Sequence, residues 1–211
     1  MTGSGIGTPA TAGNTLFTVA EARAFSKGEL ASATDYPDAK IIAKEAEIRA
    51  FLTNVCHVDF IPTVHTDEYQ DGDSSSSLIL DWPLVTAVTA ASTRAGTTWT
   101  PLTADELASV QPSNTGEVYW DCFYWPTGRR NVKLTYTAGH AVVPDEIKRA
   151  ALIIAVTDMP TSNVPLSAES YDEGGMSVSF AQGDGYNGAW HRVAEVRRAI
   201  RMYDRSGVGL A

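Results

Sequence analysis

The glycine-rich stretch GDGYNG, residues 183–188, is the part of the sequence that most resembles a cofactor-binding motif. It matches G-x-G-x-x-G, in which glycines let the backbone approach a dinucleotide pyrophosphate at a helix N-terminus. That chemistry requires a second parallel strand after the helix, and only residues 189–211 follow the motif. We therefore interpret the stretch as a turn between a strand and a helix, and we expect no cofactor.

The residues that most often perform catalysis or bind metals are scattered along the chain. No H-E-x-x-H pair, G-x-S-x-G elbow, P-loop or S-x-x-K motif is present, so we predict no catalytic residue and no metal centre. An acidic group near residue 70 could bind a cation, but its spacing lacks the calcium-loop pattern, which favours a solvated loop. The histidines are His57, His65, His140 and His191, and the acidic group is Asp67, Glu68, Asp71 and Asp73.

The two cysteines, Cys56 and Cys122, lie far apart in the sequence. Neither belongs to a C-x-x-C pair or to a zinc-binding spacing. We expect both to be free, buried thiols of the kind found in reducing compartments.

The segment YWDCFYWP, residues 119–126, is the densest group of aromatic residues. In a strand, alternate side chains point to opposite faces, so this segment would place aromatic rings on both faces. That arrangement favours a role in the core or at a subunit interface over a ligand-binding shelf. The aromatic residues assigned to this role are Tyr119, Trp120, Phe123, Tyr124 and Trp125. A small-ligand-binding or enzymatic domain that uses this segment is the alternative.

Positive charge is concentrated at the C-terminal end of an acidic chain. Residues 1–190 carry 11 Lys and Arg against 23 Asp and Glu, whereas residues 191–211 carry five Arg against two acidic residues. The acidic body argues against wrapping nucleic acid, because phosphate contacts require Lys and Arg. A last helix, predicted over residues 190–203, combines an apolar stripe with Arg197, Arg201 and Arg205 at four-residue spacing. The alternatives are a solvated face and a surface for an acidic partner.

Helical spacing predicts two helices before residue 62. Thr18 and Glu21 form a T-x-x-E capping box, which begins a helix over residues 19–30. A second helix starts at DYPD, residues 35–38, and apolar residues then recur every three or four positions up to residue 55. Glu45 and Arg49 are spaced as an ion pair on a helix, and we expect them on its exposed side.

The composition of residues 62–138 predicts a β-structure. Five segments rich in β-branched and apolar residues predict strands, and RAGTTW at 94–99 predicts a hairpin tip. The polar run DGDSSSS at 71–77 predicts a loop. We expect a small antiparallel sheet or barrel from the segments 63–69, 78–82, 84–93, 116–124 and 131–137.

A further helix is predicted from Pro144, because proline suits the first helical turn and the acidic pair Asp145–Glu146 favours the positive end of the helix dipole. From residue 150 to 156 this helix is apolar on every side, so it should be buried against neighbouring helices and against the sheet or another subunit. Residues 162–173 predict a loop, and MSVSF at 176–180 predicts a strand.

The order of these segments resembles the head–tail connector (adaptor, or head completion) proteins of long-tailed bacteriophages. LILDWPLVTAV at 78–88 resembles the strand–proline–strand entry of that family, and YTAGHAVVPDEIKRAALIIA at 136–155 resembles its central junction. Residues 29–54 are similar to its paired N-terminal helices, and ESYDEGGMSVSF at 169–180 with the last helix resembles its C-terminal portion. The resemblance covers most of residues 16–205, although the β-rich segment is longer than in compact members.

This resemblance implies a structural virion protein with no enzymatic activity, no cofactor and no membrane contact. Its subunits would form a homo-oligomeric ring, twelvefold in the family, between the portal protein and a stopper or tail protein. DNA would pass through the ring without specific binding, during both packaging and ejection. The protein would assemble in the host cytoplasm and lie at the head–tail interface of the virion. A stopper or a tail-terminator protein is the alternative within this class.

The family engages the portal through its C-terminal portion. The resemblance therefore makes the basic residues there the candidate portal-binding residues: Arg192, Arg197, Arg198, Arg201 and Arg205.

The predicted fold class is α+β: mostly a helical bundle, with an inserted antiparallel β-rich sheet or barrel and a C-terminal helix plus tail. Residues 1–15 show neither the basic nor the apolar region of a secretory signal and predict a flexible arm. Residues 206–211 predict a tail. Residues 16–205 are expected to form one connector domain, which consists of N-terminal helices (16–61), a β-rich insertion (62–138) and a helical C-terminal part (139–205).

Overall fold

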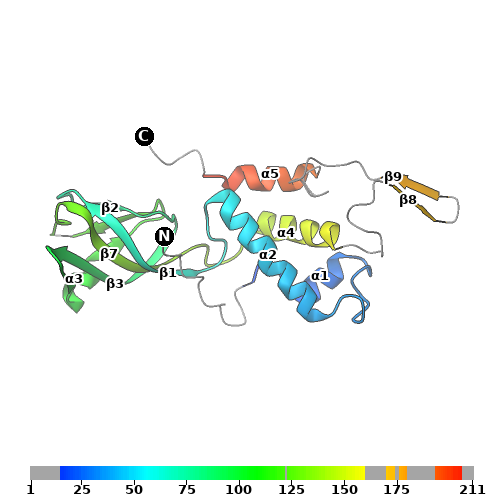
Figure 1. The fold of residues 1–211 in the computed structure, drawn as a ribbon, viewed down its shortest axis with the longest axis horizontal. Coiled ribbons are helices and arrows are strands. Elements are labelled where there is room, and N and C mark those ends of the chain that lie inside the picture. Colours follow the sequence, from blue (N-terminus) through cyan, green and yellow to red (C-terminus); the bar gives the residue numbers. More distant parts are fainter. Residues whose placement is uncertain (1–14, 122, 160–169, 174–175, 180–192, 206–211) are drawn as a thin grey trace. The chain divides into compact units, whose positions relative to one another are not determined.

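The computed structural model describes residues 15–121, 123–159, 170–173, 176–179 and 193–205. They fall into two compact units, shown in Figure 1: the β unit is residues 57–143, and the helical unit consists of the described parts of 15–56 and 144–211. Strands contribute about as many residues as helices. The predicted α+β class is confirmed, whereas the prediction that most of the fold is a helical bundle is not.

The helical unit begins with α1 (Val19–Phe25), whose N-terminus is the predicted capping box. The Thr18 hydroxyl accepts a hydrogen bond from the Glu21 backbone N–H, and the Glu21 carboxylate accepts one from the Thr18 N–H. The helix is shorter than the predicted 19–30. Lys27 and Gly28, directly after its C-cap, have φ angles of 53° and 103°. Such left-handed residues end a helix.

The second helix, α2 (Asp38–Cys56), begins where the DYPD segment predicts. Its Glu45 is buried, which contradicts the expectation of an exposed position. Glu45 lies four residues after Ile41 and three before Ile48, both buried, so it belongs to the same helical stripe. Its carboxylate accepts a hydrogen bond of 2.9 Å from the Leu16 backbone N–H, and Arg49 lies 3.9 Å away. The buried carboxylate therefore holds the segment before α1 against α2.

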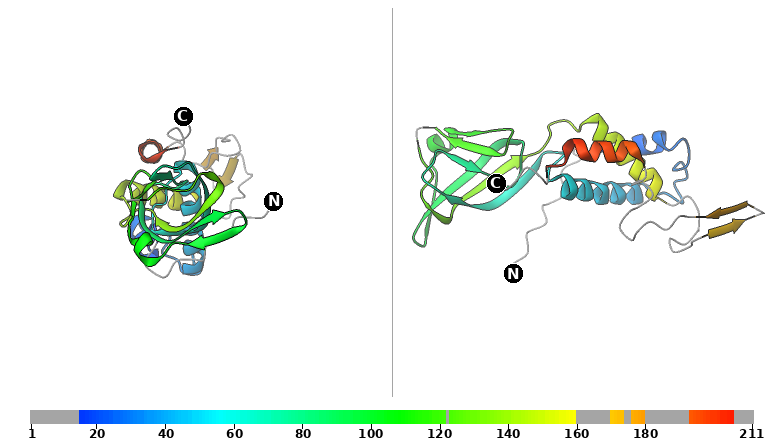
Figure 2. Two further views of the ribbon diagram at one scale, coloured as in Figure 1. Left: turned by 90° about the vertical axis from the view of Figure 1, so that its left-hand side faces the viewer. Right: turned by 90° about the horizontal axis from the view of Figure 1, so that it is seen from above.

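Helix α4 (Asp145–Asp158) begins after its N-cap, Pro144, and is the most buried helix of the unit. Helices α1, α2 and α5 (Ala194–Tyr203) pack around it (Figures 1 and 2). Alanines at three positions let these neighbours approach closely. In the described part of the chain, α4 is therefore buried against helices, whereas the sequence predicts burial against helices together with the sheet or another subunit. The buried residues of α4 are Ile147, Ala150, Ala151, Leu152, Ile154 and Ala155.

The β unit contains two antiparallel sheets around one core. The larger sheet has the strand order β1 (Thr63–Gly72), β7 (Gly128–Ala138), β3 (Val85–Ala95) and β4 (Thr98–Pro101). The smaller one has the order β2 (Ser77–Ile79), β6 (Glu117–Trp120) and β5 (Val110–Pro112). Every second residue of β7 from Val132 to Ala138 is buried, and residues of both sheets share one apolar cluster. The predicted antiparallel β-structure is confirmed, including the hairpin tip, where Ala95 pairs with Thr98.

The chain enters and leaves the β unit side by side. Thr63, the first residue of β1, pairs with Ala138, the last residue of β7. Next to this pair, the His140 backbone N–H donates a 3.1 Å hydrogen bond to the Asp59 carbonyl oxygen.

Three short elements of the structure were not predicted from the sequence. The short helix α3 (Ala104–Ala108) and strand β5 lie where no element is predicted, although Thr103 and Glu106 form a second capping box before α3. Strand β9 (Met176–Ser179) confirms the predicted strand, but its partner β8 (Ser170–Glu173) lies in a segment predicted as a loop. The predicted N-terminal arm up to residue 14, the GDGYNG stretch, Cys122, Arg192 and the C-terminal tail lie outside the described residues.

Gly139, within the junction YTAGH, is a position where only glycine fits. Its φ is +117°, and a Cβ added there would lie 2.3 Å from the carbonyl oxygen of Ile61. The Gly139 N–H also donates a 3.1 Å hydrogen bond to the Leu84 carbonyl. The strand end is thus held by backbone contacts on both sides, which a side chain would separate.

We expect Gly139→Ala to lower the free energy of unfolding by about 2 kcal/mol or more, because it adds a backbone overlap to the strain of a left-handed residue. Gly96→Ala is the matched control: Gly96 has φ +62°, but nothing lies within 4 Å of its added Cβ. Urea denaturation of both variants gives the difference. Equal losses in the two variants would contradict the proposed overlap with Ile61.

Candidate partner-binding surface

Helix α5 is amphipathic, and its apolar side packs against the helical unit. Val196 and Ala199 are buried, and Ile200 and Tyr203 are half-buried. Helices α4 and α2 lie against this side. The predicted apolar stripe is therefore present and determines which residues of α5 remain exposed.

Contacts at both ends fix α5 on the helices beneath it. Near its start, Glu195 forms an ion pair with Arg149 of α4. Beyond its end, the Arg205 N–H donates a 3.1 Å hydrogen bond to the carbonyl oxygen of Cys56, the last residue of α2. The exposed side of α5 is thus presented by an anchored helix.

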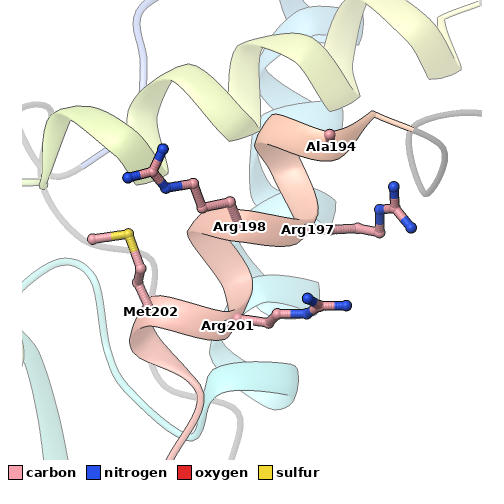
Figure 3. A pocket seen from close by; sticks show the side chains of 5 residues that line it. All are labelled: Ala194, Arg197, Arg198, Arg201 and Met202. Atoms are coloured by element: carbon pink, nitrogen blue, oxygen red, sulfur yellow. The ribbon is translucent and has the colours of Figure 1, made fainter.

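The exposed side of α5 carries Arg197, Arg198 and Arg201, which we call the arginine face. Together with Ala194 and Met202 these residues line a hollow of about 340 Å³ (Figure 3). In Figure 3, Arg197 and Arg201 extend to the same side of the helix, and Arg198 and Met202 extend to the other. Guanidinium groups at i and i+4 can contact one partner together.

The arginine face is not neutralised within the described part of the chain. Elsewhere in the helical unit, Arg23 pairs with Asp38 at 2.6 Å and Lys44 with Asp158 at 3.4 Å. By contrast, no described carboxylate lies within ion-pair distance of Arg197, Arg198 or Arg201. A guanidinium group presents donors that match a carboxylate in a two-pronged contact, so this surface suits an acidic partner.

The sequence-predicted series of arginines is only partly helical. Arg197 and Arg201 lie one helical turn apart as expected, but α5 ends at Tyr203 with Asp204 as its C-cap. Arg205 is exposed beyond the helix end and does not continue the helical spacing.

The aromatic segment of residues 119–125 divides between core and surface. Trp120 and Trp125 are buried with their ring centroids 4.7 Å apart, whereas Tyr119, Phe123 and Tyr124 are exposed. Strand alternation predicts Trp120 and Tyr124 on one face, which is wrong because β6 ends at Trp120 and the chain turns there. Neither indole N–H has an acceptor among the described residues.

A histidine–aspartate pair in the β unit was not recognised from the sequence. His65 Nε2 lies 2.6 Å from Asp59 Oδ2, and the His65 ring stacks between Trp82 and Tyr136 at 4.9 and 5.2 Å. The Tyr136 hydroxyl donates to Glu68, and burial together with this carboxylate raises the Tyr136 pKa far above its usual value. This network links His65 and Glu68 of β1 to Tyr136 of β7 and so supports the pairing of the two strands.

The acidic residues near position 70 have protein partners. Asp67 pairs with Lys133 at 3.2 Å, Asp71 accepts a hydrogen bond from the Arg130 N–H, and Asp73 accepts one from the Ser75 N–H. Hydrogen bonds from Ser75 lower the pKa of the exposed Asp73 carboxyl. No cluster of three or more His, Cys, Asp or Glu side chains among the described residues is placed to hold a metal ion.

Cys56 is a free, buried thiol, as predicted. Burial, and to a smaller extent the carboxylate of Asp204, raises the pKa of this thiol to about 11. Its Sγ donates to the carbonyl oxygen of Ile200 at 3.9 Å. The thiol therefore belongs to the contact between α2 and α5.

We expect Cys56 to resist alkylation by iodoacetamide at pH 8 in the folded protein, because only the thiolate reacts and the raised pKa keeps the thiol protonated. In urea the thiol should react at the rate of a free cysteine. Peptide mass spectrometry distinguishes Cys56 from Cys122. Rapid labelling of Cys56 without urea would show that α5 does not cover it.

Comparisons with known proteins give a weak structural likeness. No family model matches the sequence, and no curated protein matches it. Among solved structures, a chain of the "Neck of empty GTA particle computed with C6 symmetry" is 17% identical with a TM-score of 0.48. The alignment covers 62% of this chain and 71% of that chain. A likeness at this level carries no argument about function. Within the described residues, no helix is long and apolar enough to cross a membrane.

Proposed function

We propose that this chain is a head–tail adaptor subunit of a phage-like particle, forming a ring between the portal and the stopper or tail. The order of motifs from residue 16 to 205 supports assignment to the class of head–tail connector proteins. The observation that carries the role is the arginine face, a basic surface that no described carboxylate neutralises, on an anchored helix of a chain with net charge −9.

In this role the arginine face docks on the portal. Because α5 is held by Arg149 at one end and by the Cys56 carbonyl at the other, its backbone needs little ordering when its arginines meet acidic groups. Charge attraction would also speed the encounter and make binding sensitive to salt.

The acidic remainder of the chain suits a DNA conduit. Residues 1–190 carry a net charge of −12. If the ring lines its channel with this acidic surface, DNA phosphates are repelled and the DNA moves through without adhering. The ring therefore transmits DNA and binds proteins.

A deletion of the gene, combined with addition of purified protein, tests this function. Without the chain, unjoined heads and unjoined tails should accumulate. Adding the purified full-length chain should restore joined particles that contain a ring of this protein. A stopper would instead leave an adaptor ring in place on the isolated heads. Normal joining without the chain would overturn the proposal.

A further inference from the structure

One face of the larger sheet carries an ordered row of basic and aromatic side chains. Tyr69 of β1 pairs with Lys133 of β7, Lys133 pairs with Ser92 of β3, and Arg94, two residues further along β3, pairs with Trp99 of β4. Directly paired residues point to the same face of a sheet. The neighbours of Lys133 in β7, Val132 and Leu134, belong to the core, so this row points outward.

Cation–π contacts hold this row in place. The guanidinium of Arg130 lies 4.9 Å from the centre of the Tyr69 ring, and the Arg94 guanidinium and the Lys133 amine lie 5.4 and 5.6 Å from that of Trp99. Arg130 has a φ of 47° in an irregular part of β7, where its N–H donates to Asp71. Irregular strand positions re-aim side chains. We call Tyr69, Arg94, Trp99, Arg130 and Lys133 the basic–aromatic patch.

The basic–aromatic patch is a local exception in the charge of the β unit. Residues 57–143 contain four Lys and Arg against ten Asp and Glu, and three of the four basic residues lie in the patch. Lys133 pairs with Asp67, but no described carboxylate lies within ion-pair distance of Arg94 or Arg130. Two fixed guanidinium groups are therefore available to an acidic partner.

The outward face of the smaller sheet has the opposite character. Ile79 is 73% exposed and pairs with Glu117, and Tyr119, on the same strand face as Glu117, is 41% exposed. The Tyr119 hydroxyl donates to the Glu117 carboxylate, which fixes that side chain. Leu78 and Val118, which alternate with these residues, lie in the shared core. We call Ile79, Glu117 and Tyr119 the acidic–apolar face.

We propose that the basic–aromatic patch of one copy of this chain docks on the acidic–apolar face of the next copy. This inference rests on the proposed ring and names the contact between its subunits. Both sheets turn their inner faces to one core, so the two outward faces point away from each other. Two different, complementary faces on one subunit form a head-to-tail contact, which closes into a ring when the rotation allows.

The observations favour a second copy over nucleic acid as the partner. Single-stranded nucleic acid stacks its bases on open aromatic faces, but the rings of Tyr69 and Trp99 already carry cations. The β unit as a whole is acidic, which repels phosphates. The exposed Ile79 and Tyr119 gain from burial against another protein surface.

A charge exchange across the contact tests the inference with the full-length chain. Arg94→Glu with Arg130→Glu, and separately Glu117→Lys, should each reduce the restoration of joined particles about tenfold or more, because like charges then face each other. The chain carrying all three substitutions should recover most of the loss. Asp105→Lys, at an exposed acidic residue on α3, is the control and should join particles as wild type does.

The outcomes distinguish a failure of this inference from a failure of the proposed function. If wild type joins particles and the exchange variants join equally well, the contact between copies is elsewhere and the adaptor function stands. If wild type itself fails to join particles, both proposals fall. Wild type that binds duplex or single-stranded oligonucleotides in fluorescence anisotropy, while the Arg94/Arg130 variant does not, would make the patch a nucleic-acid surface and overturn the inference.

Discussion

Replacing Ile154 with aspartate will prevent the helical unit from folding. Ile154 is 2% exposed in the most buried helix of that unit, surrounded by α1, α2 and α5. An unpaired carboxylate in an apolar site costs several kcal/mol, and the total stability of a domain is only about 5–15 kcal/mol. We expect loss of the cooperative thermal transition of the helices, measured by circular dichroism at 222 nm.

The matched control is Ile42→Asp, the same chemical change on α2 at a side chain that is 56% exposed. It lies in the second turn of α2 and should change the melting temperature by only a few degrees. If Ile154→Asp melts as close to wild type as Ile42→Asp does, helix α4 is not the buried centre of the unit.

Under the proposed adaptor function, reversing two charges of the arginine face will strongly weaken attachment to heads without unfolding the chain. Arg197 and Arg201 are exposed and extend to the same side of α5, so replacing both with glutamate presents two negative charges where an acidic partner must dock. We expect a loss of attachment of about a hundredfold or more, since like charges across an interface cost several kcal/mol. Co-sedimentation of the protein with DNA-filled heads measures attachment.

Lys27→Glu with Lys40→Glu gives the same change in net charge within the same unit and at exposed positions. This control variant should still attach to heads. Attachment of the wild-type chain should weaken as the salt concentration is raised. Equal attachment by the Arg197/Arg201 variant and wild type would show that the arginine face is only a solvated surface.

Elements with a local chemical signal were predicted well. The capping box at Thr18, the helix start after DYPD and the proline before α4 are each determined by a few neighbouring residues, and the structure confirms all three. The predicted apolar stripe of α5 is also present, and it leaves Arg197, Arg198 and Arg201 exposed.

Apart from the missed capping box before α3, the errors arose where distant residues decide the outcome. The spacing of Glu45 and Arg49 predicts an ion pair on the surface. In the structure Glu45 is buried, because its carboxylate accepts a hydrogen bond from the Leu16 N–H, 29 positions away in the sequence. Trp120 and Trp125 enter the core together because the chain turns after β6, which strand alternation does not describe. The basic–aromatic patch draws its five residues from four strands, so only the strand order and register bring it together.

The adjacency of the two ends of the β unit has a consequence for how this gene can change. Thr63 and Ala138 are paired, and the Asp59 carbonyl is hydrogen-bonded to the His140 N–H. The segment between them, residues 63–138, therefore begins and ends at neighbouring positions in space. The Cα atoms of directly paired antiparallel residues lie only about 5 Å apart. A short turn could therefore replace everything between them, and a single recombination event could add, exchange or remove the cassette. Related chains should accordingly vary most in the length of this segment while keeping the helices on either side of it.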